Sequence, residues 1–262
     1  MKRQIVPFVD HEIGFRLLDK LFEHVVLGEI EIPLVVTSEK NGEVWWPGVE
    51  PLCEEHNIPL FRYGAGNLKD HIPENVDWFM LLSWTYIMPP SLIEMAAKGV
   101  VNLHYSLLPM YRGVYPVNWA VVEGERKTGI TYHVVTQHID SGPILLQAEA
   151  RVYPSDTART LQLRLDELAT CNFDAVIAKL LSASSYEINR IKGNSHIAEN
   201  TAYYSHKKFK ESCEIDLNAS YTGAEIINLL RGLTFLEDTD NAFFYDPETG
   251  KKVFLSLHLR CE

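Results

Sequence analysis

Short apolar runs that alternate with helical patterns limit the folds open to this chain more than any other feature. Runs of strand length occupy residues 4–9, 32–37, 59–61, 76–83 and 100–104. A turn is expected at residues 10–14, and helical patterns follow at residues 15–26, 49–56 and 91–98. Strands that alternate with helices at this spacing predict parallel βαβ units, and hence an α/β fold with a doubly wound, mostly parallel sheet.

The rest of the chain predicts an extension of that sheet and then a smaller unit. Two further strands are expected at 129–135 and 144–152, followed by a long helix at 157–181 with Asp156 as its N-cap. The tail has a helical pattern at 222–233 and a hairpin-like pair at 242–245 and 252–259. The sequence therefore predicts a core at residues 1–182, a linker at 183–202 and a small α+β appendage at 203–262. A hairpin of this size is not stable alone, so we expect it to dock on the core or on a second subunit.

Composition and charge exclude several classes of protein. The chain has 262 residues, with 24 Lys and Arg against 35 Asp and Glu, and its net charge of −11 argues against tight, non-specific nucleic-acid binding. The four cysteines are scattered and form no CxxC pair, as is typical of reduced thiols in a cytoplasmic protein. The apolar run of the N-terminus breaks at Asp10, and the longest apolar runs have the length of strands. We therefore expect a cytoplasmic protein without a signal peptide, and without a nucleic-acid or membrane partner.

Three polar residues predict a proton-handling site at the carboxyl end of one strand. Asn102 and His104 are two residues apart, so they lie on the same face of the strand at 100–104. Asp140 opens the sequence Asp-Ser-Gly-Pro, a tight turn that holds a carboxylate in place. A carboxylate orients a neighbouring imidazole, and an Asn amide can donate to an oxygen that becomes negative. The trio suits attack by a nitrogen on a carbonyl carbon, although the spacing alone is also consistent with purely structural strand-end and turn residues.

The sequence around these residues resembles that of a known family. Residues 100–113 read VVNLHYSLLPMYRG, and the folate-dependent formyltransferases have a strand with N-x-H that runs into S-L-L-P-x-Y-R-G. Residues 128–135 and then DSGPIL at 140–145 resemble the continuation of that family through D-x-G-P-I. The resemblance is dense from residue 81 to residue 180 and stays in register, more weakly, from residue 4.

The resemblance implies a Rossmann-like formyltransferase core and a role for each of the three residues. Asn102, His104 and Asp140 would form the catalytic triad, with 10-formyl-tetrahydrofolate as the formyl donor and no metal. The histidine would take a proton from the incoming amine, the asparagine would stabilise the oxyanion and the aspartate would hold the histidine. A metal site at His133 and His138 has no support, because the residues between them supply no ligand pattern.

In the family that this chain resembles, the pterin ring of the folate lies between two loops. The first loop follows the strand at 76–83, and its predicted folate contacts are Trp84, Tyr86, Ile87 and Met88. The second loop supplies Gln137, Ile139 and Asp140. Backbone groups can bind the amide edge of a pterin while apolar side chains form the walls of the slot. Simple core packing of the first loop's aromatic and Met side chains remains the alternative.

The acceptor is less constrained by the sequence. Glycinamide-ribonucleotide formyltransferases carry a glycine-rich phosphate loop after the first strand, where residues 8–14 here read FVDHEIG with two carboxylates. Methionyl-tRNA formyltransferases have a longer C-terminal barrel and a positive surface, and formyl-folate hydrolases carry an extra N-terminal domain. The short tail resembles that of nucleotide-sugar N-formyltransferases. The favoured acceptor is dTDP-4-amino-4,6-dideoxyglucose, for O-antigen, lipopolysaccharide or other surface-glycan biosynthesis.

Several alternatives stay open beside that acceptor. They are a dTDP-3-amino sugar, a UDP-aminosugar, glycinamide ribonucleotide, methionyl-tRNA, hydrolysis of the formyl-folate, and ligand binding without catalysis. The predicted acceptor contacts are Ser106, Tyr111, Arg112, Gly113, Tyr203 and Tyr204. Arg112 could instead brace its loop through backbone carbonyls, and the sequence favours neither role. Enzymes of this type are usually dimers, so a homodimer is expected.

Overall fold

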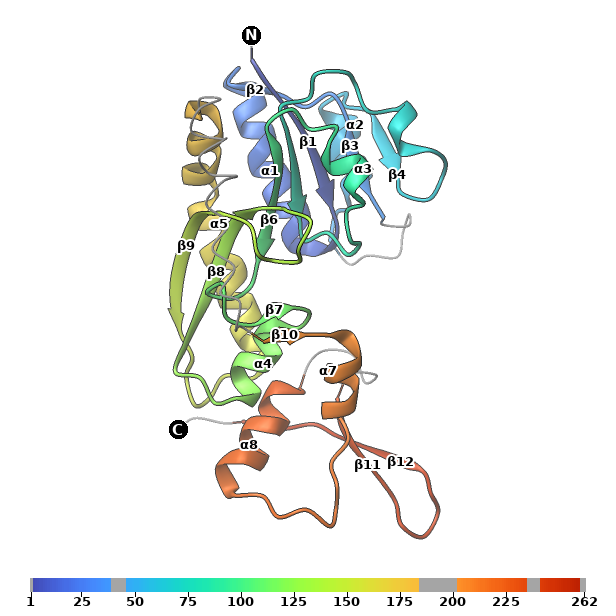
Figure 1. Cartoon of the computed structure of the whole chain (residues 1–262), viewed down its shortest axis with the longest axis vertical. Coiled ribbons are helices and arrows are strands. Elements are labelled where there is room, and N and C mark those ends of the chain that lie inside the picture. The colour runs from blue at the N-terminus through green and yellow to red at the C-terminus, as the bar shows by residue number, and fades with distance from the viewer. Residues whose placement is uncertain (1, 39–45, 184–201, 235–240, 260–262) are drawn as a thin grey trace.

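A mixed sheet forms the centre of the computed structural model, which describes residues 2–38, 46–183, 202–234 and 241–259 (Figure 1). The strands follow the order β4-β3-β1-β5-β6-β8-β9, and β2 also pairs with β1. They are β1 (Arg3–Val9), β2 (Ile30–Glu31), β3 (Val35–Thr37), β4 (Leu60–Arg62), β5 (Trp78–Leu82), β6 (Gly99–His104), β8 (Lys127–Val134) and β9 (Ile144–Arg151). Pairing is parallel from β4 to β6, whereas β8 runs antiparallel to β6 and β9 antiparallel to β8. The predicted α/β fold with a mostly parallel sheet is confirmed.

Alternating side chains along the strands build two apolar layers. Ile5 and Val9 of β1 belong to the cluster that α1 (His11–Val26) and α5 (Ala158–Ser182) cover. Val6 and Phe8 belong to the cluster on the other face, beneath α3 (Pro90–Ile93). Because both faces of the central strands are buried, these strands read as nearly continuous apolar runs rather than as alternating ones. Two further helical segments lie between β3 and β5 in the chain, α2 (Val49–Glu55) and the short 3-10 helix η1 (Leu68–Asp70).

Helix α1 begins at His11 rather than at residue 15, so the predicted turn at 10–14 is wrong. His11 has a left-handed backbone with a φ of 60°, and the chain reverses there within one residue. Gly14 lies in the first turn of the helix, where a Cβ would come within 2.4 Å of the Leu82 carbonyl oxygen. This glycine serves the close approach of α1 to β5 rather than a turn.

Six elements were not predicted, and several boundaries differ. The unpredicted elements are β2, η1, β7 (Arg112–Gly113), α4 (Pro116–Val122), β10 (Tyr203–Tyr204) and α7 (His206–Ser212). Helix α3 covers residues 90–93 rather than 91–98, β12 (Lys252–Leu255) stops before residue 259, and β3 covers only the second half of the run at 32–37. Within the described ranges, no helix is both long enough and apolar enough to cross a membrane.

The N-cap of α5 is Thr157, not the predicted Asp156. The Thr157 hydroxyl accepts from the backbone N–H of Thr160, and the Thr160 side chain closes a capping box. The carboxylate of Asp156 is taken up elsewhere, because it accepts from the Tyr153 N–H at 2.6 Å and from the guanidinium of Arg164. The sequence placed the cap one residue too early because both residue types are good N-caps.

The C-terminal part packs a small apolar cluster against α4. Asn118 of α4 donates to the Gly232 carbonyl of α8 (Gly223–Gly232) at 2.8 Å. Phe243 of β11 (Ala242–Tyr245) bonds through its backbone to Cys213 and Ile215, which follow α7. The predicted hairpin of β11 and β12 therefore docks on the segment after α7, within an apolar cluster that also contains Trp119 and Ala120 of α4. The predicted linker at 183–202 lies, apart from its two end residues, outside the described residues.

Candidate active site

Asn102 and His104 lie on one face of β6 near its carboxyl end, as the strand alternation predicts. Leu103 between them packs into the cluster that α1 and α5 cover. His104 is buried and Asn102 is half-buried. In α/β sheets, ligands bind beyond the carboxyl ends of the strands, so both side chains stand where a site is expected.

A tight turn after β8 brings Asp140 to the same place. Asp140 has a left-handed backbone with a φ of 48°. Two residues later, a Cβ on Gly142 would lie only 1.7 Å from the Val134 carbonyl oxygen, so this position accepts glycine alone. The turn is thereby pressed against the end of β8, which fixes the carboxylate that precedes it.

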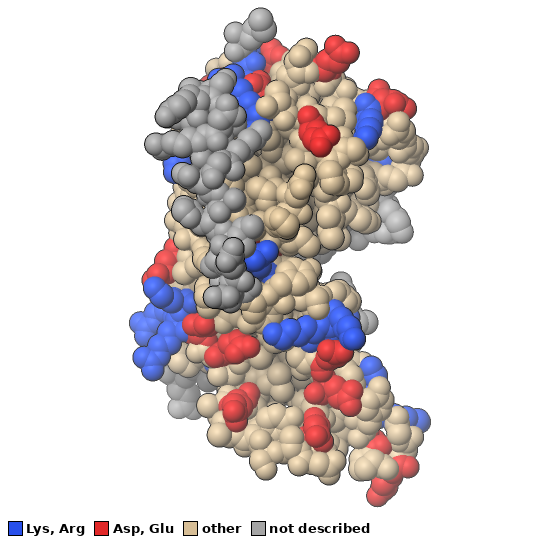
Figure 2. Space-filling model, in the orientation of Figure 1, with Lys and Arg blue, Asp and Glu red and all other residues tan. Residues whose placement is uncertain are grey.

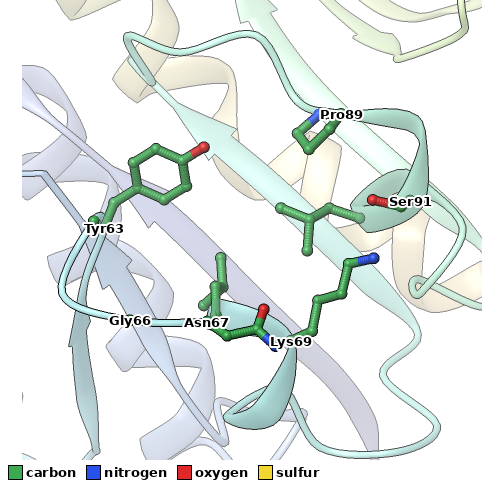
Figure 3. A pocket seen from close by; sticks show the side chains of 9 residues that line it. Tyr63, Gly66, Asn67, Lys69, Pro89 and Ser91 are labelled. Atoms are coloured by element: carbon green, nitrogen blue, oxygen red, sulfur yellow. The ribbon is translucent and has the colours of Figure 1, made fainter.

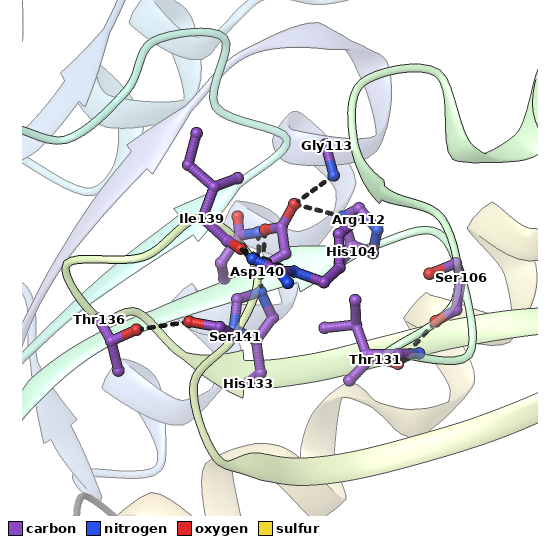
Figure 4. Close-up of polar contacts among 12 residues, drawn as sticks. His104, Ser106, Arg112, Gly113, Thr131, His133, Thr136, Ile139, Asp140 and Ser141 are labelled. Atoms are coloured by element: carbon purple, nitrogen blue, oxygen red, sulfur yellow. Dashed lines mark hydrogen bonds and ion pairs between the residues drawn. The ribbon is translucent and has the colours of Figure 1, made fainter. Parts of the chain in front are cut away.

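The Asp140 carboxylate lies between two histidines (Figure 4). Its Oδ2 is 3.6 Å from His104 Nδ1 and accepts from the Gly113 N–H at 2.9 Å, while Oδ1 is 3.5 Å from His133 Nε2. Burial raises the pKa of Asp140, but His104, His133 and the Gly113 N–H together lower it by more, so the pKa lies well below its usual value. The carboxylate is therefore ionised, and its negative charge lies beside both imidazole rings.

One ring nitrogen of His104 is committed to the backbone. Nε2 lies 3.0 Å from the carbonyl oxygen of Tyr111, and because a carbonyl only accepts, this nitrogen carries a hydrogen. In the neutral ring the free lone pair is therefore on Nδ1, which faces Asp140. Burial lowers the pKa of His104 and outweighs the opposite effect of Asp140, so the neutral form is favoured. Nδ1 is the atom of this ring that can take up a proton.

Hydrogen bonds within the chain hold the loop at residues 105–113. The Ser106 hydroxyl donates to the Met110 carbonyl at 2.5 Å, and the Tyr111 hydroxyl donates to Glu125 at 2.8 Å. Both side chains are buried. The structure therefore encloses these two predicted acceptor contacts instead of presenting them to a substrate, because their polar atoms serve to fix the loop.

Arg112 takes the bracing role that the sequence left open. Its Nε and Nη2 donate to the Ile139 carbonyl at 3.1 and 2.8 Å. The guanidinium thus ties the loop of Asp140 to the 105–113 loop. Since the next residue, Gly113, donates its N–H to Asp140, both residues of β7 serve the position of the carboxylate.

The appendage reaches this site through β10. Tyr203 and Tyr204 pair in parallel with Arg112 and Gly113 of β7. A Cβ on Gly113, whose φ is 105°, would lie 2.2 Å from the Tyr204 carbonyl oxygen and 2.8 Å from the Tyr203 ring. The structure therefore brings the four predicted acceptor contacts at 112, 113, 203 and 204 together, with the Tyr203 side chain 47% exposed.

The predicted folate contacts on the loop at residues 83–89 include both buried and exposed side chains. Met88 is buried in the cluster beneath α3, and Trp84 packs against that cluster. In contrast, Tyr86 is 48% exposed and Ile87 is 77% exposed. Met88 is therefore a core residue, and Trp84 is partly one, as the alternative interpretation predicted. The side chains at the tip of the loop are exposed and free to contact a ligand.

The loop at residues 135–140 starts beside the 83–89 loop, because Val135 packs against the same cluster beneath α3. Gln137 is exposed, and Ile139 is 39% exposed. Exposed apolar side chains on these two loops fit the flat pterin and aryl rings of a folate. The residues present are thus suited to the implied formyl donor.

Asp10, directly after β1, ties two loops together. Its Oδ1 accepts from the N–H and hydroxyl of Ser38 at 3.0 and 2.7 Å, and its Oδ2 accepts from the N–H and hydroxyl of Thr85 at 3.1 and 2.8 Å. The side chain is only 3% exposed. A buried carboxylate therefore occupies the position where a phosphate-binding glycine loop would lie, and it anchors the base of the 83–89 loop.

A pocket of about 350 Å³ lies between the segment after β4 and the start of α3. Tyr63, Gly66, Asn67, Lys69, Pro89 and Ser91 are among the residues that line it (Figure 3). Asn102, His104 and Asp140 do not border this pocket, so it is separate from the predicted catalytic site.

His133 is the residue of this site that the sequence analysis missed. It was considered only as a metal ligand, yet its ring lies against both Asn102 and Asp140. Across the described residues, no group of three or more His, Cys, Asp or Glu side chains is arranged to hold a metal ion. The antiparallel register that pairs Asn102 with His133 would have revealed the contact, but the sequence does not specify that register.

Two family models match the chain. A formyl transferase model matches residues 62–177, and a model of the N-formyltransferase dimerization C-terminal domain matches residues 208–260. The bifunctional polymyxin resistance protein ArnA of Wigglesworthia glossinidia brevipalpis is 28% identical over 237 residues, which cover 88% of this chain and 34% of that protein. The methionyl-tRNA formyltransferase of Geobacter sulfurreducens is 33% identical over 144 residues, which cover 52% of this chain and 44% of that protein. The chain thus spans less than half the length of these two curated relatives.

Solved structures resemble the whole chain. A 4-N formyltransferase from Francisella tularensis has a TM-score of 0.76 at 23% identity, and the match covers 99% of both chains. An N-formyltransferase from Helicobacter canadensis, solved in complex with folinic acid and dTDP-3-aminofucose, has a TM-score of 0.66 at 20% identity, with 90% of this chain and 81% of that chain covered. At these identities the likeness establishes a shared fold, and in the first case it extends over both the core and the appendage.

Proposed function

This chain belongs to the formyltransferase family, and we propose that it transfers the formyl group of 10-formyl-tetrahydrofolate to the amino group of a nucleotide-linked aminodideoxysugar. The observation that carries the proposal is the pair of the buried His104 and the half-buried Asp140 beside the Asn102 amide, at the carboxyl end of β6. These three groups supply a proton acceptor, a fixed negative charge and a hydrogen-bond donor within one site. The favoured acceptor is dTDP-4-amino-4,6-dideoxyglucose.

The reaction forms one C–N bond and breaks another. The amine nitrogen of the acceptor attacks the formyl carbon, and the bond from that carbon to N10 of the folate breaks. His104 Nδ1 accepts the proton that the amine loses, and Asp140 stabilises the resulting imidazolium. Asn102 donates to the formyl oxygen while that oxygen is negative. The imidazolium then returns its proton to N10, so protons and bonds balance.

The choice of a sugar acceptor rests on overall architecture. The 4-N formyltransferase of Francisella tularensis matches this chain over nearly the full length of both, including the appendage. The Helicobacter canadensis protein, which shares the fold, was solved with a dTDP-linked amino sugar. In this chain the half-exposed ring of Tyr203 lies against Gly113, whose N–H donates to Asp140. At this place the ring could stack on a thymine base.

Formylation of methionyl-tRNA is the second candidate, because the curated relatives include methionyl-tRNA formyltransferases. The net charge of −11 opposes binding to a polyanion. On the face seen in Figure 2, Lys and Arg side chains lie among Asp and Glu side chains rather than in a continuous basic field. A dTDP-3-amino sugar and a UDP-aminosugar remain alternatives within the sugar class.

The proposal includes a homodimer in the cytoplasm that serves the synthesis of a surface glycan. The C-terminal family model is that of a dimerization domain. Tyr245 and Phe254 on the hairpin are 45% and 46% exposed, which leaves apolar surface for a second copy to cover. Sedimentation at the working concentration tests the dimer, and a monomer would contradict it.

Mass spectrometry with a panel of acceptors tests the activity directly. Purified protein is mixed with 10-formyl-tetrahydrofolate and, in separate reactions, with dTDP-4-amino and dTDP-3-amino dideoxyhexoses, a UDP-aminosugar, glycinamide ribonucleotide and charged initiator tRNA. We expect a formyl-sized mass gain on a dTDP-amino sugar alone. A gain on the tRNA alone would overturn the sugar proposal, and release of formate without any formylated acceptor would indicate a hydrolase.

A further inference from the structure

We propose that His133 is a positioning residue that fixes the side-chain amide of Asn102 with its nitrogen toward the ring. The catalytic meaning of this inference rests on the proposed function, whereas the hydrogen bond between the His133 ring and the Asn102 amide does not depend on it. It concerns a residue outside the triad, on the strand that pairs with β6. The register of β6 and β8 places Asn102 directly opposite His133.

The hydrogen bonds of the His133 ring determine which nitrogen carries the proton. Nδ1 lies 3.2 Å from the carbonyl oxygen of Val134, and a carbonyl only accepts, so Nδ1 is the donor. In the neutral ring Nε2 then has a free lone pair. Asn102 Nδ2 lies 3.2 Å from that nitrogen, so the amide N–H donates to His133. Only one orientation of the amide makes this bond, because the amide oxygen has no hydrogen to give.

The orientation matters because the two ends of an amide have opposite effects on a developing oxyanion. With one N–H bonded to His133, the second N–H of Asn102 remains to donate to the formyl oxygen of the substrate. If the amide rotated by half a turn, its carbonyl oxygen would replace that donor and repel the negative charge. His133 therefore selects the amide orientation that supports formyl transfer.

Two further observations favour this role over an action through Asp140. His133 Nε2 is 3.5 Å from Asp140 Oδ1, and only the protonated ring can donate to that carboxylate and so lower its pKa; in the neutral ring this nitrogen has no hydrogen to give. Asp140 is already held by the Gly113 N–H at 2.9 Å. The His133 side chain is 2% exposed, so its hydrogen bonds are protected from competition with water.

A double-mutant cycle on kcat tests the role if formyl transfer is established. His133→Leu is expected to lower kcat by about tenfold or more, and by less than the about 10²–10³-fold typical of losing an oxyanion donor outright. His133→Gln keeps an acceptor oxygen near the place of Nε2 and is expected to retain most of kcat. In an Asn102→Ala background, His133→Leu should have little further effect, because its partner is already gone.

The opposite pattern in the cycle would overturn the proposal. If His133→Leu costs the same factor with and without Asn102, but nothing in an Asp140→Ala background, then His133 acts through the carboxylate. Thermal melting of each variant separates loss of folding from loss of orientation, and His133→Gln is the variant that carries the test if His133→Leu does not fold.

A second measurement does not depend on activity. Long-range ¹H–¹⁵N correlation spectra of the wild-type protein at neutral pH report which ring nitrogen of His133 is protonated, with the signals assigned by their loss in His133→Gln. The proposal requires a protonated Nδ1 and a bare Nε2. The opposite tautomer would exclude the Asn102 hydrogen bond and sink the proposal, even for an active enzyme. The required tautomer in a protein that formylates no acceptor would instead count against the proposed function alone.

Discussion

The two loops that border the site are built in opposite ways. In the 105–113 loop, the side chains of Ser106, Tyr111 and Arg112 are all spent on hydrogen bonds within the chain. In the 83–89 loop, the base is anchored through Thr85 on Asp10, while the tip carries exposed apolar side chains. The polar side chains of the first loop are bonded without a ligand, although Met110 on it is 48% exposed, whereas the second loop gathers exposed apolar side chains at its tip, where a ligand or partner would cover them.

This difference separates two tasks of the proposed enzyme. Groups that stabilise a transition state act best when the fold holds them in place before the substrate arrives. Apolar surface that becomes buried on binding contributes affinity instead, at roughly 25 cal/mol per Å². Substitutions around the 105–113 loop and Asp140 should therefore change kcat, and those at the tip of the 83–89 loop should change KM.

The largest effect is expected at the triad itself. His104→Asn and Asp140→Ala should each lower kcat by about 10²–10⁴-fold, because the first removes the proton acceptor and the second removes the charge that stabilises its protonated form. Turnover on the best acceptor, with melting temperature as the control for folding, provides the measurement. Near-normal turnover in either variant would refute the assigned mechanism.

Substitution of Gly113 tests whether the rigid loop matters beyond the triad. A Cβ at this position would meet the Tyr204 carbonyl oxygen at 2.2 Å, so Gly113→Ala must shift β7 from β10 and draw its N–H away from Asp140. We expect kcat to fall about tenfold or more, as for the loss of a group that orients a reactive one.

Gly64→Ala is the matched control for Gly113→Ala. Gly64 also has a positive φ, 92° against 105°, but its Cβ would meet nothing within 4 Å. Both variants should lose about 1–2 kcal/mol of stability from backbone strain, and Gly113→Ala should lose more, because its Cβ also displaces β7 from β10. Only Gly113→Ala should also lose activity, and an equal loss of activity in both would show that the pairing of β7 with β10 does not position the carboxylate.

The pH profile should follow the neutral form of His104. Burial holds the pKa of His104 below the ordinary 6.5, so the base form predominates above that pH and activity falls as the pH drops through the lowered value. Below it, kcat should decline about tenfold per pH unit. Asp140 raises the pKa of His104. Asp140→Asn should therefore shift the fall of kcat to still lower pH and also reduce the maximal kcat. A shift toward higher pH would contradict the pairing of these two groups.

Local patterns were enough to predict part of the site. Asn102 and His104 share a face because a strand alternates, and the turn at Asp140 follows from its Gly-Pro continuation. The contact of Asn102 with His133 depends on the register between β6 and β8, for which no local signal exists. Two-residue strands leave no pattern either, so the pairing of Tyr203 with Arg112 could not be predicted.

The fold was predictable to a similar depth. Long apolar runs and amphipathic helices predicted most strands and helices of the core along the chain, because burial on both faces dictates composition. The start of α1 at His11 and the start of α4 after Tyr115 were missed. Both depend on a non-glycine residue in a left-handed conformation, with φ values of 60° and 58°, which tertiary contacts impose against local preference.

The smallest expected effect lies at the tip of the 83–89 loop, and it decides whether that loop contacts the folate. Ile87 is 77% exposed, so Ile87→Ser should leave the melting temperature unchanged. If the donor covers this side chain, losing about 1–2 kcal/mol of apolar burial should raise its KM about 5- to 30-fold while kcat stays constant.

Val26→Ser is the control for Ile87→Ser, because Val26 is 75% exposed at the end of α1, away from the triad, and should leave KM and kcat unaltered. Met88→Ala, one residue beyond Ile87 but buried in the core, should instead cost about 2–5 kcal/mol of stability. If Ile87→Ser lowers kcat at an unchanged KM, the tip acts on the reaction rather than on binding, and the division between a preformed loop and a binding loop fails.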